Sequence, residues 1–166
     1  MKRLRWSLLL CLLAGSCGGG STDSSLSDSS GVGEAFAKRA VAVCQRAADA
    51  KAANGPFPFP DFNPTAPDES KFPVIATVLA KMDAVWASWY ADMSALGRPP
   101  EAGEAWDDLL EQIKAHREIN LDQIDAARHD DADRFAEDYQ KGTETQDRLL
   151  AAATAAGVPK CAEVDR

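Results

Sequence analysis

Residues that commonly carry catalysis or hold cofactors are scarce in this chain of 166 residues. It has two histidines, and no G-x-G-x-x-G, Walker, H-E-x-x-H or C-x-x-C-H motif, so nucleotide, zinc-protease and c-type haem chemistry lack support. A di-iron bundle needs Glu-x-x-His on two helices, and neither histidine has a glutamate three residues before it. None of the serines beyond residue 33 (Ser70, Ser88 and Ser94) lies in a nucleophile elbow. The sequence therefore predicts no enzyme, no cofactor and no dedicated metal site.

Positive charge is also scarce. The formal net charge is −8, and it becomes −11 without Lys2, Arg3 and Arg5. A chain this acidic repels phosphate backbones, so we expect no nucleic-acid partner. The hydrophobic content of 45% is ordinary for a folded chain, and the length suits one domain with a real core.

The N-terminus combines a short basic stretch with an apolar run over residues 7–14. That run is too short to span a bilayer but suits a secretory signal peptide. Three small residues, Ala14, Gly15 and Ser16, lead directly into Cys17. This arrangement resembles the lipobox of bacterial lipoproteins, except that Ala14 stands where leucine is usual. Alternatively, Cys17 is an incidental cysteine near an ordinary cleavage site.

The lipoprotein resemblance implies that residues 1–16 are removed and that the thiol of Cys17 carries a diacylglyceryl group. Two acyl chains give stable membrane anchoring, so we expect a lipid-anchored protein on the extracytoplasmic face of the cell membrane. The stretch from Gly18 to Gly33 is almost wholly Gly, Ser and Asp and is expected to be a flexible tether. The folded domain would then comprise residues 34–166.

Four helices are expected in that domain, and no strand. Apolar residues recur at helical spacing over residues 34–54, 73–96, 100–127 and about 131–156. Asp130 or Asp131 is a candidate cap for the last helix. The expected inward residues of that helix are Phe135, Tyr139, Gly142, Gln146, Leu149 and Ala153. Short connections between the last three helices predict an all-α, up-and-down four-helix bundle. A loop rich in Pro and Phe would join its first two helices.

Cys44 and Cys161 are the only cysteines after Cys17. Disulfides persist in exported proteins, so an even pair indicates a bridge between the first helix and the C-terminal tail. The alternative is a thiol site for metal or redox chemistry, although no C-x-x-C or nearby histidine accompanies either cysteine. The frame of lipobox, tether, first-helix cysteine and closing G-x-x-x-C also resembles uncharacterised helical lipoproteins of high-GC bacteria, which implies an architecture and a location but no activity.

Polar residues interrupt the apolar faces of the third and fourth helices. An antiparallel pairing about a turn near residue 130 would place Asn120 near Tyr139, and His116 near Thr143, with Gln146 one turn further. These five residues are candidates for a pocket that holds a small polar ligand or one weakly bound metal ion. Alternatively, they form a hydrogen-bonded layer that fixes helix register, or face solvent.

The segment GPFPFPDFNP alternates Phe57, Phe59 and Phe62 with prolines. Its phenylalanines are a candidate surface for an envelope protein or the membrane edge, or alternatively a lid over the open end of the bundle. Acidic residues on the last two helices are expected to form a solvated surface, or alternatively a cation-binding face that lacks EF-hand spacing; they are Glu104, Asp107, Asp108, Glu111, Asp130, Asp131, Asp133, Glu137 and Asp138. The sequence thus favours a non-enzymatic envelope protein that acts by binding or contact, or as a small-ligand carrier or sensor.

Overall fold

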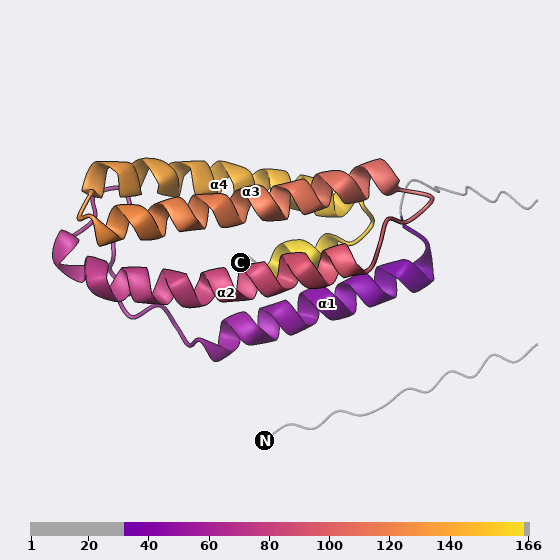
Figure 1. Cartoon of the computed structure of the whole chain (residues 1–166), viewed down its shortest axis with the longest axis horizontal. Helices are drawn as coiled ribbons and strands as arrows, with labels where there is room; N and C mark the ends of the chain where they lie inside the picture. The colour runs from indigo at the N-terminus through magenta and orange to yellow at the C-terminus, as the bar shows by residue number, and fades with distance from the viewer. Residues whose placement is uncertain (1–31, 165–166) are drawn as a thin grey trace, which may run out of the picture.

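The computed structural model describes residues 32–164, and these residues confirm the all-α bundle. Its four long helices are α1 (Glu34–Ala53), α2 (Phe72–Ala95), α3 (Gly103–Arg128) and α4 (Ala132–Ala155). Two short 3₁₀ helices, η1 (Glu69–Lys71) and η2 (Pro159–Val164), accompany them, and the described part of the chain contains no strand. Successive long helices run in opposite directions along the bundle (Figure 1).

Local chemistry sets the helix ends. The side chain of Asp131 caps α4 by accepting a hydrogen bond from the backbone N–H of Arg134 at 3.0 Å. At the other end of α4, Gly157 adopts a φ of 75°, a left-handed conformation that glycine takes without strain. The backbone N–H of Val158 then donates to the carbonyl of Ala153 at 2.9 Å, which is the Schellman pattern that ends many helices.

That reversal turns the C-terminal segment back into the bundle. η2 packs against both α1 and α4, while α1 itself packs on α2 and η2, so η2 fills the position between the first and fourth helices (Figure 1). Its residues Cys161, Ala162 and Val164 are buried because they take part in the main core. The sequence predicted only a disulfide in this tail, whereas the tail also packs between α1 and α4 as part of the bundle.

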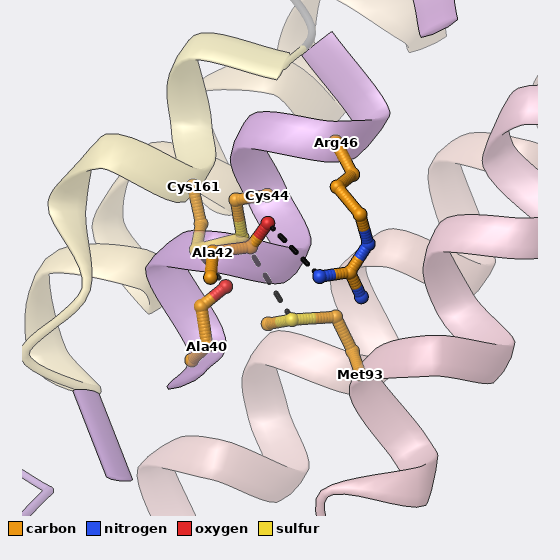
Figure 2. Close-up of a disulfide and its surroundings, with 6 residues drawn as sticks. All are labelled: Ala40, Ala42, Cys44, Arg46, Met93 and Cys161. Atoms are coloured by element: carbon orange, nitrogen blue, oxygen red, sulfur yellow. Dashed lines mark hydrogen bonds between the residues drawn. A yellow bond between two sulfur atoms is a disulfide. The ribbon is translucent and has the colours of Figure 1, made fainter. Parts of the chain in front are cut away.

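The expected disulfide joins Cys44 of α1 to Cys161 of η2, with a Cα–Cα distance of 5.1 Å. Both cysteines are buried, and Met93 of α2 brings its sulfur to 3.7 Å from Cys44 Sγ (Figure 2). Sulfur chains are soft and fill irregular gaps well. The bridge therefore fastens η2 to α1 at a place where three elements already meet.

Two separate clusters make up the core. The larger occupies the end where α1 begins, and includes Trp89, Trp106, Leu109 and Leu149. The smaller lies at the opposite end, around Phe72, Ile75 and Phe135, with Phe59 and Phe62 of the loop packed against it. Between Ile113 and Ile124 on α3 the one buried residue is the polar Asn120, and between Phe135 and Leu149 on α4 the buried residues are the polar Asp138 and Thr145. The core is interrupted there.

Three sequence expectations need correction. Val32 is only 8% exposed and lies in the larger core cluster, so the folded part begins before residue 34. Tyr139, expected to face inward, is 41% exposed. Asp138, expected on the solvated acidic surface, is buried instead. The orientation of α4 turns Asp138 away from solvent, and Arg134 and Lys141 supply positive charge beside the carboxylate.

The proposed lipid-bearing Cys17, the signal peptide and most of the tether lie outside the described residues. Within residues 32–164, no helix combines the length and the apolar character that crossing a membrane requires.

Candidate functional site

The interruption in the core is occupied by a cleft between α3 and α4. All five residues of the candidate pocket line it: His116 and Asn120 from α3, and Tyr139, Thr143 and Gln146 from α4. The volume of this cleft is about 210 Å³. Ile119, Gln123 and Gly142 complete its lining. The structure therefore brings together the residues that the antiparallel pairing of α3 and α4 had placed near each other.

Two of the lining residues are tied to α2. The ring of His116 stacks on Trp86, with ring centroids 4.2 Å apart and an angle of 24° between the planes. Asn120 is 6% exposed, and its Nδ2 donates a hydrogen bond to the carbonyl of Leu79 at 3.3 Å. An interhelical hydrogen bond of this kind fixes register. The register alternative is therefore correct for Asn120, which serves the packing of α3 on α2.

The remaining polar groups of the cleft are less committed. Thr143 Oγ1 donates to the backbone carbonyl of Tyr139 at 3.2 Å, a bond within α4. Among residues 32–164, the side chains of Gln123 and Gln146 and the hydroxyl of Tyr139 make no hydrogen bond to protein. Two amides and one phenol thus keep donors and acceptors for water or for a bound molecule.

A second, larger cavity adjoins the cleft beneath the Pro/Phe-rich loop. Its volume is about 410 Å³, and Gln123 and Tyr139 line both spaces. The other lining residues are apolar: Phe57, Phe59, Pro60, Phe62, Pro64, Ile75, Leu79 and Phe135. We call the two spaces together the composite cleft. It has a polar end between α3 and α4, and an apolar end under the loop.

The loop phenylalanines gather at that apolar end. The rings of Phe62 and Phe135 are 5.9 Å apart and nearly perpendicular, and Phe57 lies 5.7 Å from Phe62. Phe59 and Phe62 are half-buried against the smaller core cluster, while Phe57 is 40% exposed. The loop accordingly covers the end of the bundle as a lid does, and it exposes one of its three rings.

Sequence reasoning missed Gln123 and gave Gly142 no role in the site. Gln123 lies one helical turn after Asn120, so the same spacing that selected Asn120 could have found it. Glycine within a helix is destabilising by about 0.5–1 kcal/mol relative to alanine. At Gly142 it leaves the polar end wider, because an added Cβ would lie 3.7 Å from Cγ2 of Ile119.

A charged network joins α3 and α4 through other residues. Arg134 pairs with Asp122 and Asp125 of α3, and Lys141 Nζ lies 3.0 Å from Asp138 Oδ1. The hydrogen bond to Asp138, followed by that to Glu137, raises the pKa of Lys141. Similarly, the bond to Asp125 raises the pKa of Arg134. These groups are engaged with each other and none of them lines the composite cleft.

Over the residues that the structure describes, no group of three or more His, Cys, Asp or Glu side chains is arranged to hold a metal ion. Comparison with known proteins gives no match to a family model, to a curated protein or to a solved structure. The function is therefore argued from the geometry of the chain itself.

Proposed function

We propose that this chain is a non-enzymatic, lipid-anchored protein of the extracytoplasmic membrane face, and that it binds a small ligand in the composite cleft. The observation that carries the binding proposal is the interrupted core. On α3 the apolar packing stops between Ile113 and Ile124. Here the interruption is a cleft that holds amides and hydroxyls with unused hydrogen-bonding groups.

Binding of a small molecule accounts for the cleft better than contact with a partner protein. A contact surface built on the loop would present its three phenylalanines together, whereas Phe59 and Phe62 are half-buried on the bundle. Phe57 is the one exposed ring of the three. A single ring is small compared with a stable protein interface, which buries about 800 Å² on each partner. Contact with an envelope protein through Phe57 remains the second candidate.

The composition of the cleft favours binding over catalysis. Its lining contains one imidazole and one phenol as titratable groups, and no carboxylate, thiol or amine. General acid–base and nucleophilic catalysis both need a reactive group oriented by a second one. The ring of His116 stacks on the indole of Trp86, and the other polar groups of the polar end are amides and hydroxyls, so the site favours recognition.

The proposed anchor also has a geometric consequence. Fourteen residues separate Cys17 from Val32; the tether expected from their composition would have a root-mean-square reach of about 20 Å. Helix α1 then runs 20 residues away from that point, or about 30 Å. The Pro/Phe-rich loop lies at the far end of α1 (Figure 1). The proposed anchor would therefore attach at the end of the bundle opposite the loop.

Native mass spectrometry of the protein purified from its own envelope tests the binding proposal. We expect a population that carries additional mass, which is lost on denaturation and reduced in a Gln146→Leu variant. A matched Leu121→Ala variant alters an exposed residue outside the composite cleft and should keep the additional mass. Bare protein from every preparation would contradict the proposal.

The anchor is tested separately by metabolic labelling with a radioactive fatty acid. We expect the label to enter the wild-type chain and to be absent from a Cys17→Ser variant. Equal labelling of both chains would contradict lipidation at Cys17. Labelling and ligand binding are independent, so either part of the proposal can fail without the other.

A further inference from the structure

We propose that the ligand of the composite cleft is a neutral amphiphile, whose apolar part lies under the Pro/Phe-rich loop and whose uncharged polar head lies between α3 and α4. This inference rests on the proposed binding function and names the chemical class of the ligand. It follows from the polarity of the two ends, from the two residues that line both of them and from the absence of Asp, Glu, Lys and Arg in their lining.

The two ends differ sharply in chemistry. At the apolar end, eight of the ten lining residues are Phe, Pro, Ile or Leu, and the two polar ones are Gln123 and Tyr139. At the polar end, six of the eight lining residues carry an amide, hydroxyl or imidazole group. Gln123 and Tyr139 line both ends, so a single ligand that passed between them would exchange apolar contacts for hydrogen bonds at this junction.

The size is that of a small-molecule site. The volumes of about 210 Å³ and 410 Å³ together fall within the range of about 300–1,000 Å³ that is typical of ligand pockets. The larger space is the apolar one, which suits a ligand with more hydrocarbon than head. Burial of hydrocarbon would supply most of the affinity, and the polar head would supply orientation.

The absence of charge in the lining selects a neutral head. No Asp, Glu, Lys or Arg lines either end. A buried ionic head needs an opposite charge, because its desolvation otherwise costs several kcal/mol. The ammonium of Lys71 lies 5.6 Å from the centroid of the Phe59 ring and already pairs with Asp68. Amides and hydroxyls, in contrast, match hydroxyl, carbonyl or amide groups of a neutral ligand.

Isothermal titration with monoalkyl glucosides tests this class directly. Both core clusters and the disulfide lie within residues 32–164, so the secreted segment 18–166 retains the packing of the domain. Glucosides with hexyl, octyl and decyl chains are compared below their micellar concentrations with alkyl phosphates and alkyltrimethylammonium ions of equal chain length. We expect the neutral series to bind tightest, with affinity rising up to about fourfold per methylene, and free glucose to give no detectable heat.

Two variants assign the ends of the ligand. Phe57→Ala alters the apolar end at a 40% exposed residue, and we expect its effect on affinity to grow with chain length. Gln146→Leu alters the polar end, and we expect a loss of about two- to tenfold that is equal at every chain length. Leu121→Ala is the matched control, because Leu121 is also 40% exposed and lies outside the cleft; its affinities should match wild type.

Equal or tighter binding of the charged series, or affinities independent of chain length, would overturn the inference. A charged or wholly hydrophilic molecule on the native protein would also overturn it, while leaving the proposed binding function intact. If neither the glucosides nor a native ligand bind to the protein, both the amphiphile class and the proposed binding function are wrong. Offering a monoacylglycerol in phosphatidylcholine vesicles distinguishes the source: withdrawal from the vesicles indicates a membrane lipid, and binding only of dissolved glucosides indicates a soluble amphiphile.

Discussion

Removal of the disulfide is the perturbation whose magnitude the structure defines best. The bridge joins residues 117 positions apart, and closing a loop of that length restricts the unfolded chain by a chain-entropy limit of about 5 kcal/mol at 25 °C. The Cys44→Ala/Cys161→Ala double variant also leaves space where two buried sulfur atoms packed near Met93. Native disulfides commonly contribute about 2–5 kcal/mol to stability. We expect the free energy of unfolding of the double variant to fall by about 4–5 kcal/mol, at the upper end of this range.

Urea-induced unfolding followed by far-ultraviolet circular dichroism measures this loss, because four long helices dominate the described domain. At slopes of about 1–3 kcal/mol per molar urea, the midpoint should fall by more than about 1 M. Reductant should bring the wild-type curve down toward that of the variant, and should leave the curve of the cysteine-free variant unchanged. A loss below about 1 kcal/mol would refute the idea that the bridge secures η2 between α1 and α4.

Three further predictions concern α4 and the α2–α3 turn. Gly142→Ala should raise the free energy of unfolding by about 0.5–1 kcal/mol, because glycine is less favourable than alanine within a helix and the added methyl fits, at 3.7 Å from its nearest neighbour. Gly97→Ala should lower the free energy of unfolding, because φ at Gly97 is 78°. Thermal melts of both variants test the contrast. Asp131→Ala removes the side-chain cap of α4 and should cost about 1 kcal/mol in urea unfolding, and Asp131→Asn should restore most of it. The hydrogen bond to Asp138 raises the pKa of Lys141 above its usual value of 10.5. The stabilisation from this pair is therefore complete below pH 10.5 and is lost as pH rises through the folded-state pKa. Lys141→Met should weaken the alkaline decline in the free energy of unfolding, and an unchanged decline would contradict the assignment.

The helices were predictable because each carries a strong local signal. The alternating spacing of Ile75, Trp86, Trp89 and Met93 defines the buried stripe of α2, and all four are buried. The same periodicity, with a turn near residue 130, was enough to bring His116 and Thr143 to one cleft. Local spacing determines which residues share a face, and an antiparallel pair determines which faces meet.

Tertiary effects account for what the sequence did not predict. The rotation of α4 that buries Asp138 depends on Arg134 and Lys141 both reaching its carboxylate, and hydrophobic periodicity does not register such pairing. The insertion of η2 depends on the chain reversal at Gly157 and on the space that α1 and α4 leave between them. The apolar end of the composite cleft, in turn, depends on the path of an irregular proline-rich loop, for which no periodic rule exists.

The position of η2 has a consequence for how the protein is made. A ribosome delivers Cys44 well before Cys161, because the two cysteines lie 117 positions apart. The first helix is therefore made long before the segment that fixes it on its far side, and its cysteine is open to other thiols in the interval. Closure of the bridge therefore waits for Cys161, and a chain cut after Lys160 would lack both the bridge and most of η2.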